Sequence, residues 1–213
     1  MSVTDSLGEA WLEIARRILA EGRESTYDGL PILEVAHASL VVTKPDPDDA
    51  LIAAHANPER LAWMRTNFVD RALVAELGDA RSYASRLFDY AGTGVDQVQW
   101  VIDRLRDDPS SRSATITTFE PTLDTTYIPC VSLLDFWIPA YPRSAAAVDL
   151  VVYAHSIDFG SKGYGNLVQL ADLQQRVAAS LDRPVGSLTF IVKSAHVYAT
   201  EFEYMRGVLA VAP

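Results

Sequence analysis

VDLVVYAHSID, residues 148–158, is rich in β-branched and aromatic residues and predicts a long β-strand. It runs into a glycine-rich loop, FGSKGYG at 159–165, and Asn166 then provides a cap for a helix that extends to about Leu181. SLTFIVKSAHVYA, 187–199, follows as a further strand. This order of strand, loop, helix and strand indicates a mixed α/β fold.

The regions before this stretch support the same fold class. Apolar residues at helical spacing predict helices at 4–22, over most of 51–90 and at 95–105. Runs of β-branched and aromatic residues predict strands at 33–43, 113–119 and 127–138. Because no repeat, low-complexity segment or linker interrupts these elements, we expect residues 1–213 to form a single domain.

The composition narrows the class of protein. Among 213 residues, 49% are hydrophobic and 22% are charged, as in globular proteins. The formal net charge of −10 and the absence of a Lys/Arg stripe argue against a nucleic-acid partner. No apolar run is long enough to span a membrane, and the first residues lack the pattern of a signal peptide. We therefore expect a cytoplasmic protein without a membrane partner.

A few residues carry candidate chemistry. Cys130, the only cysteine, follows a proline in an apolar strand, where it is either a small buried hydrophobe or a nucleophile. His155 and Asp158 lie at the end of the 148–158 strand, and His196 lies on the last strand. Their spacing matches no zinc pattern, so we predict no metal site.

Taken in order, five segments resemble the thymidylate synthase family, which also includes the cytidylate hydroxymethylases. These segments are VDQVQWVIDRLRDDPSSR (95–112), YIPC (127–130), HSID (155–158), Asn166 and AHVY (195–198). The resemblance implies a thymidylate-synthase-like α/β fold, with a mixed sheet flanked by helices and a homodimer formed sheet against sheet. The short length is similar to that of the compact, archaeal-type branch.

The resemblance also implies a reaction. The family transfers a one-carbon unit from 5,10-methylenetetrahydrofolate, its cosubstrate, to C5 of a pyrimidine nucleotide or nucleoside. Cys130 matches the nucleophile that adds to C6 and makes C5 reactive. Asn166 matches the residue that reads the N3/O4 edge of the base and favours uracil, since the cytidylate hydroxymethylases have Asp there. Tyr83 matches a tyrosine that helps to remove the C5 proton.

The remaining matches concern substrate binding. His196 and Tyr198 match the pair that holds the 3′-hydroxyl of the sugar. Ser156 matches a phosphate ligand, and Asp158 matches a residue that contacts both the base and the pterin of the cosubstrate. Arg112 matches an arginine that reaches across the dimer to the substrate phosphate.

The chain departs from the family pattern at several positions. His155 stands where the family has an arginine that binds phosphate and activates the cysteine, and Ser113 replaces a second cross-dimer arginine. The loss of these charge-assisted contacts indicates an altered phosphate site. The family's tryptophan pair has no clear match, and without that shield water would capture the one-carbon unit and give a hydroxymethyl product. A non-catalytic pyrimidine-binding protein or repurposed scaffold is the alternative from another functional class.

Overall fold

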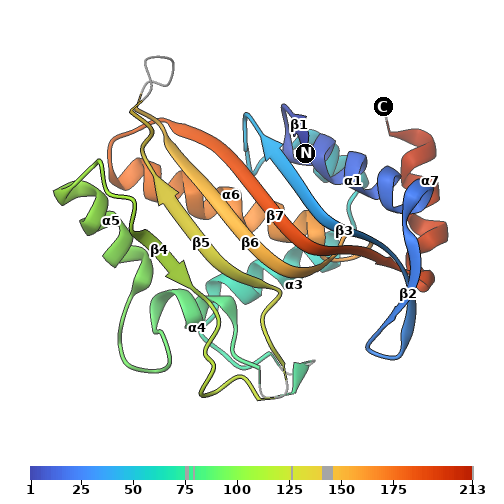
Figure 1. Cartoon of the computed structure of the whole chain (residues 1–213), viewed down its shortest axis with the longest axis horizontal. Helices are drawn as coiled ribbons and strands as arrows, with labels where there is room; N and C mark the ends of the chain where they lie inside the picture. The colour runs from blue at the N-terminus through green and yellow to red at the C-terminus, as the bar shows by residue number, and fades with distance from the viewer. Residues whose placement is uncertain (75–76, 79, 126, 141–145, 213) are drawn as a thin grey trace.

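The structure is a computed structural model that describes residues 1–74, 77–78, 80–125, 127–140 and 146–212. Its centre is one mixed β-sheet (Figure 1). Across the sheet the strands run in the order β1 (Ser2–Thr4), β3 (Leu30–Val42), β7 (Val185–Tyr198), β6 (Val148–Asp158), β5 (Val131–Trp137) and β4 (Ala114–Thr117). The short strand β2 (Arg23–Tyr27) pairs with the beginning of β3. The predicted mixed α/β class is therefore confirmed.

The helices are packed mainly on one face of this sheet. They are α1 (Leu7–Glu21), α2 (Ala50–His55), α3 (Pro58–Val69), α4 (Tyr83–Phe88), α5 (Gln97–Asp107), α6 (Gly163–Ser180) and α7 (Phe202–Val211), with a 3₁₀ turn, η2 (Ala199–Glu201), before α7. In Figure 1, α1, α3 and α6 lie behind the strands. No helix in the described part of the chain combines the length and apolar character needed to cross a membrane.

The opposite face of the sheet carries a row of apolar side chains. Leu133 on β5 is paired with Tyr153 on β6, and Tyr153 is paired with Ile191 on β7. These three side chains are between 37% and 39% exposed, whereas their sequence neighbours Leu134, Val152 and Val192 are at most 1% exposed. The period-2 pattern of the strands thus gives one buried face and one open face, which is uncovered by helices in Figure 1.

The centre of the sheet is built from β6, α6 and β7. β6 and β7 are parallel, and α6 provides the crossover between them that parallel strands require. The glycine loop before α6 allows close packing, because a Cβ on Gly163 would lie 2.6 Å from the Phe159 ring and one on Gly165 would lie 3.0 Å from Met64 Cβ. α1 is fastened to the same loop, since Trp11 Nε1 donates to the Phe159 carbonyl at 2.9 Å.

The regular pairing of the strands is interrupted at one level of the sheet. Strand β7 lies between β3 and β6, but its residue Lys193 pairs with neither His37 of β3 nor His155 of β6. His37 also has a positive φ of 54°. Beyond this level the alternation of burial is lost, and residues 156–158 and 195–197 are buried without a break. The ends of the two central strands are therefore enclosed on both faces.

The structure corrects several boundaries predicted from sequence. β1 and β2 were absent from the prediction, because short strands at a sheet edge have little apolar pattern: all five residues of β2 are exposed. The predicted helical region 51–90 is divided into α2, α3 and α4. Asn166 is not the cap of α6, which begins at Gly163; the Asn166 amide already donates to the Lys162 carbonyl as part of the helix.

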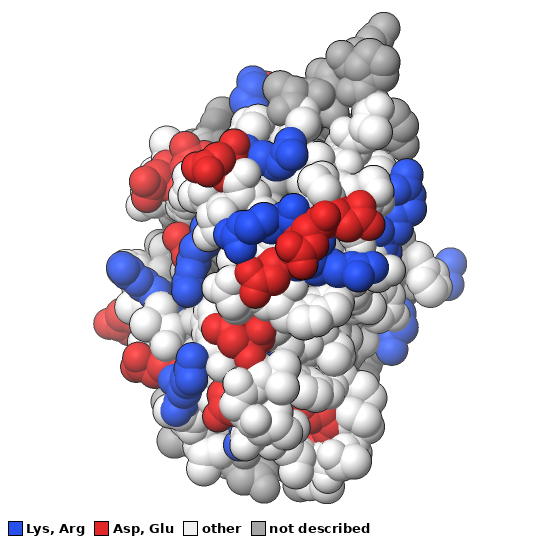
Figure 2. Space-filling model, turned by 90° about the vertical axis from the view of Figure 1, so that its left-hand side faces the viewer, with Lys and Arg blue, Asp and Glu red and all other residues white. Residues whose placement is uncertain are grey.

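Charged residues of both signs are distributed over the α5 side of the molecule. Figure 2 shows Lys and Arg side chains there between Asp and Glu side chains. Asp103 and Arg106 on α5 form one such exposed pair, with 2.8 Å between the carboxylate oxygen and the guanidinium nitrogen. This face therefore has no extended basic surface.

In the described part of the chain, one ion pair has both side chains buried. Arg86 on α4 binds both carboxylate oxygens of Asp124, at 2.7 and 2.9 Å, and also donates to the Thr118 carbonyl at 2.7 Å. Both side chains are nearly inaccessible, at 1% and 4% exposure. The pair joins α4 to the segment that follows β4 and leads toward Cys130.

Because Asp124 is buried, we expect Arg86→Met to lower the free energy of unfolding by about 3–5 kcal/mol, as the carboxylate would lose its counter-charge. Urea unfolding measures this loss. Arg106→Met, at the exposed pair with Asp103, is the matched control and should cost about 0–1 kcal/mol. Equal losses of unfolding free energy in the two variants would contradict a structural role for the buried pair. The double variant Arg86→Met/Asp124→Leu should recover much of the stability lost in Arg86→Met, because no unpaired carboxylate remains buried.

Candidate active site

A cleft at the carboxyl ends of β6 and β7 contains most of the residues singled out in the sequence. Its volume is about 560 Å³ including the solvent-open mouth, a size typical of small-molecule sites. Seven of the nine predicted site residues line it: Tyr83, Cys130, Ser156, Asp158, Asn166, His196 and Tyr198. They come from α4, β6, α6, β7 and the segment before β5, so distant parts of the sequence converge here.

Cys130 lies immediately before β5 and is partly exposed. Its carbonyl accepts a hydrogen bond from the His155 amide at 3.0 Å, which anchors it to β6. Its Sγ lies 3.7 Å from the Tyr127 hydroxyl. Burial raises the pKa of the Cys130 thiol, while the Tyr127 hydrogen bond and the positive charge of Lys162 act in the opposite direction.

Tyr83 is the first residue of α4, and hydrogen bonds fix both its backbone amide and its side-chain hydroxyl. Its amide donates to Asn67 Oδ1 at 2.9 Å, and its hydroxyl accepts from the Val131 amide at 3.0 Å. Its ring also stacks on Phe68, with 4.6 Å between the centroids. Burial raises the pKa of the Tyr83 hydroxyl, so the group is protonated at neutral pH and retains a proton to donate.

Asn166 presents an unused acceptor to the cleft. Its side-chain nitrogen donates to the Lys162 carbonyl at 3.1 Å, whereas its Oδ1 is buried and has no hydrogen-bond partner among the described residues. A buried amide oxygen without a partner is costly unless a ligand or water satisfies it. The second N–H of the same amide also stays available, so Asn166 offers a donor and an acceptor side by side.

His196 and Tyr198 form an aromatic cluster with Tyr27. The His196 ring centroid lies 5.3 Å from that of Tyr27 and 5.1 Å from that of Tyr198. His196 Nδ1 is 3.4 Å from Ser156 Oγ, and its Nε2 is buried without a partner among the described residues. Burial lowers the pKa of His196, which keeps the imidazole neutral at pH 7 and leaves Nε2 for a ligand.

Asp158 ends β6 with its carboxylate fixed. One oxygen accepts from the Gly160 amide at 2.9 Å, and the other accepts from the Ser161 hydroxyl. In the β6–β7 ladder Asp158 is the direct partner of His196. The carboxylate therefore enters the cleft in one orientation, set by the loop that precedes α6.

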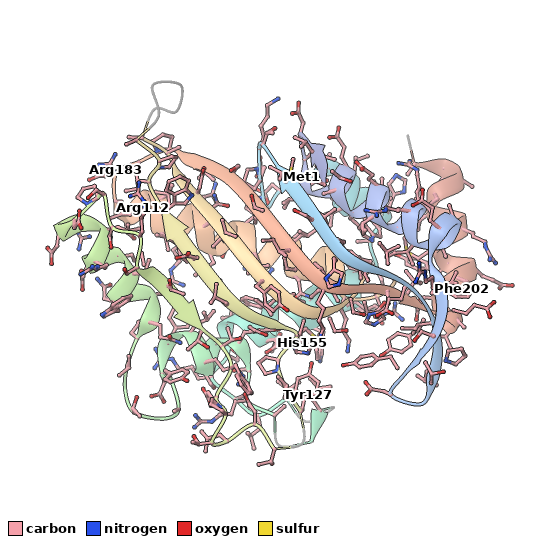
Figure 3. The ribbon with its side chains drawn as sticks, in the orientation of Figure 1. Met1, Arg112, Tyr127, His155, Arg183 and Phe202 are labelled. Atoms are coloured by element: carbon pink, nitrogen blue, oxygen red, sulfur yellow. The ribbon has the colours of Figure 1, made fainter. Side chains whose placement is uncertain are left out.

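The structure does not bring the other two predicted residues into the cleft. His155 Nδ1 lies 3.3 Å from Ser132 Oγ, and both burial and the nearby Lys193 charge lower the pKa of His155, so it carries no charge at pH 7. Arg112 is exposed; its guanidinium donates to the Ser110 carbonyl and lies 5.9 Å from the Trp137 ring. Figure 3 shows Arg112 at the opposite end of the sheet from Tyr127.

The cleft contains six polar or aromatic residues that the sequence did not single out as site residues. They are Tyr27, Asp28, Trp63, Asn67, Tyr127 and Lys162. Lys162 stands within the FGSKGYG loop, and its Nζ lies 5.6 Å from the Trp63 ring centroid. Two local signals pointed to members of this set: Lys162 stands in a loop beside the predicted ligands, and Tyr127 begins the YIPC segment that resembles the family.

A mixed sheet backed by helices, with the chain's single cysteine lining a cleft at the strand ends, is an arrangement compatible with an enzyme that uses a cysteine nucleophile. A sequence model of the thymidylate synthase family matches residues 54–213, more than half of the chain. The chain therefore belongs to the thymidylate synthase family and is a one-carbon transferase. Among the described residues no three potential ligands converge to hold a metal ion.

Individual relatives agree with this family. The chain is 29% identical to a protein of Methanosarcina mazei named "putative thymidylate synthase", over 96% of this chain and 92% of that protein. A protein of Methanothermobacter marburgensis with the same name is also 29% identical, over 96% of both chains. The thymidylate synthase of Saccharomyces cerevisiae is 24% identical over 67% of this chain and 51% of its own length.

Because burial raises the pKa of Cys130, we expect its alkylation by iodoacetamide to be slow at pH 7 and to accelerate about tenfold per pH unit below that pKa. Lys162→Met should slow the reaction at pH 8 several-fold, since it removes the positive charge that favours the thiolate. Lys44→Met, at an exposed lysine paired with Asp5, is the control and should leave the rate unchanged. A rate that does not vary with pH would contradict this assignment.

Proposed function

We propose that this chain transfers a one-carbon unit from 5,10-methylenetetrahydrofolate to C5 of a pyrimidine nucleotide or nucleoside, through a covalent adduct between Cys130 and C6. The observation that carries the proposal is the convergence in one cleft of Cys130 with two buried polar atoms that have no partner among the described residues, Asn166 Oδ1 and His196 Nε2. A substrate that fits this cleft forms hydrogen bonds with both of these atoms and places one of its carbon atoms next to the Cys130 thiol.

The role of Cys130 follows from the chemistry of the ring. C5 of a pyrimidine is a weak nucleophile, and addition of a thiolate to C6 places negative charge on C5 and O4. Lys162, which favours the Cys130 thiolate, lines the same cleft. After C5 has formed its new carbon bond, loss of the C5 proton and of the thiolate restores the ring.

Asn166 is the proposed reader of the base. Uracil presents an N3–H donor beside the O4 acceptor, and the Asn166 side chain offers the complementary pair: the unpaired Oδ1 and the remaining N–H. Cytosine lacks the N3–H, so the same amide would leave its acceptor unsatisfied. The arrangement therefore supports a uracil base.

Tyr83 is the proposed aid to proton removal. Its hydroxyl is anchored by the Val131 amide, next to Cys130 in the chain, so it stands close to the adduct. Since burial raises its pKa, Tyr83 acts as a neutral donor that orders water at C5. Asp158, already oriented by Gly160 and Ser161, is the proposed contact of the pterin.

Two products are compatible with this cleft. Transfer of a methyl group requires a hydride from the folate, whereas capture of the one-carbon unit by water gives a hydroxymethyl group. Trp63 supplies an apolar wall with Lys162 over its ring, which the sequence did not predict. We propose that Trp63 shields the one-carbon unit from water, which favours the methyl product, with hydroxymethylation as the second candidate.

Tritium release from C5-labelled pyrimidines tests the reaction without assuming the product. We expect release that depends on methylenetetrahydrofolate from the uracil compounds in a set of dUMP, deoxyuridine, dCMP and deoxycytidine, and mass spectrometry then separates methyl from hydroxymethyl. Cys130→Ala should reduce release to the background rate. Full turnover by Cys130→Ala would remove the proposed nucleophile, and no release from any compound would favour a binding protein.

We also propose that the open face of the sheet is the interface of a homodimer, as expected from the family. The row of Leu133, Tyr153 and Ile191 is apolar and laterally continuous, which suits burial against a second copy.

Light scattering during size exclusion should give a mass of twice 23.4 kDa for the unmodified protein. Ile191→Asp should shift this mass to that of one chain, because it places an unpaired charge within the interface. Val211→Asp, at a 73% exposed site on α7, is the control and should leave the dimer intact. A dimer that persists in Ile191→Asp would contradict this choice of face.

A further inference from the structure

The hydroxyl of Tyr127 lies against the thiol of Cys130. The oxygen is 3.7 Å from Cys130 Sγ, which is hydrogen-bonding distance for sulfur, and both residues line the cleft. Only three positions separate the two residues in the sequence, and the His155 amide fixes the Cys130 carbonyl to β6. The contact therefore lies within the segment that carries the proposed nucleophile and is set by the conformation of that segment.

Other tyrosines of the cleft have hydroxyls that are bound elsewhere. The Tyr83 hydroxyl accepts a hydrogen bond from the Val131 amide at 3.0 Å. The Tyr27 hydroxyl forms a hydrogen bond with Ser156. The hydroxyl of Tyr127, by contrast, is placed at the sulfur.

The proton of this contact belongs to the tyrosine. The ordinary pKa of a phenol is about 10, above the value of about 8.5 for a thiol. Burial raises the pKa of both groups, and the negative charge of the thiolate raises that of Tyr127 further. When the pair loses one proton, the thiol is therefore the group that loses it, and the Tyr127 hydroxyl donates to the sulfur. A hydrogen bond made to the charged form of a group favours its ionisation.

We propose that Tyr127 is a catalytic residue whose hydroxyl donates a hydrogen bond to the Cys130 thiolate, both before the thiolate attacks the ring and when it leaves. The inference rests on the proposed function, in which Cys130 is the nucleophile. It adds to that function a residue that the family resemblance did not assign.

Tyr127 keeps its own proton in both steps. Before the attack, the thiol proton has passed to water. A sulfur electron pair then forms the S–C6 bond, and the pair of the C5–C6 double bond moves toward C5 and O4. In the last step the S–C6 bond breaks and its electron pair returns to sulfur, while the negative charge on C5 and O4 restores the double bond. The Tyr127 hydroxyl meets the sulfur at each point where it carries a negative charge.

The hydrogen bond has opposite effects on the amount of thiolate and on its reactivity. Lowering the thiol pKa by one unit increases the thiolate fraction below that pKa about tenfold, whereas the nucleophilicity of each thiolate falls only about threefold. The net effect at neutral pH is faster attack. A thiolate of lower pKa also leaves faster. Tyr127 therefore assists both the formation and the breakdown of the adduct.

Alkylation of Cys130 measures this effect without turnover, because the chain has a single cysteine. If Tyr127→Phe raises the thiol pKa by about one unit, its reaction with iodoacetamide should be about threefold slower at pH 7. As the pH passes the pKa of the unmodified thiol, Tyr127→Phe should become the faster protein, since its thiolate is the stronger nucleophile. Tyr90→Phe, at a tyrosine whose hydroxyl donates to the Phe119 carbonyl at 3.0 Å, is the matched control and should keep the original profile.

Incorporation of 3-fluorotyrosine at Tyr127 tests the same contact in a ring of nearly unchanged shape. The fluorinated phenol is more acidic and is therefore a stronger hydrogen-bond donor. It should lower the pKa of Cys130 and raise the alkylation rate at pH 7. An unchanged or lower rate would overturn the role of the hydroxyl.

The outcomes separate this inference from the proposed reaction. Alkylation profiles that cross as expected, without tritium release from any pyrimidine, would support the hydrogen bond to the thiolate and reject the one-carbon transfer. Tritium release by the unmodified protein, with the same alkylation profile in Tyr127→Phe and Tyr90→Phe, would support the transfer and overturn the role of Tyr127. A rate in Tyr127→Phe that is reduced by one factor up to and beyond the thiol pKa would also overturn it, because that result indicates altered access to the sulfur.

Discussion

The parallel pairing of β6 with β7 is the constraint on which the site depends. Parallel neighbours require a crossover, and α6 supplies it, so the carboxyl ends of both strands and the first turn of the helix meet at one edge. This places Asp158 directly opposite His196, although 37 residues lie between them in the sequence. Asn166 enters from the helix above the same edge, and the described cleft is the consequence.

The thiol is positioned by a second set of contacts that is independent of this crossover. The Arg86–Asp124 pair holds α4 against the segment before β5, and Tyr83, one turn earlier on α4, binds the Val131 amide. The same burial that fixes Cys130 raises the pKa of its thiol, so the group needs a compensating charge to react. Lys162 is the cation in the cleft that favours the Cys130 thiolate. His155 does not supply a second positive charge, because burial and Lys193 lower its pKa.

The sequence predicted the central elements well, because long strands with β-branched residues and amphipathic helices carry strong local patterns. The strand 148–158 has the same bounds in the structure. Local patterns failed where tertiary contacts decide: all five residues of β2 are exposed, yet β2 carries the hairpin that delivers Tyr27 and Asp28 to the cleft. Trp63 likewise reads as one apolar position of a helix, and only the packing of α3 against α6 turns it toward Lys162.

The cleft combines one lysine with carboxylates, and these charges bear on the departure from the family pattern at position 155. Lys162 favours the Cys130 thiolate, whereas the negative charges of Asp158 and its neighbours act on His196, which burial keeps neutral. The resemblance assigns to position 155 an arginine with two tasks, the binding of phosphate and the activation of the cysteine. With histidine there, Lys162 of the glycine loop is the cation of the cleft that favours the thiolate, and in the proposed dimer Arg112 of a second copy is the residue that the resemblance assigns to the phosphate.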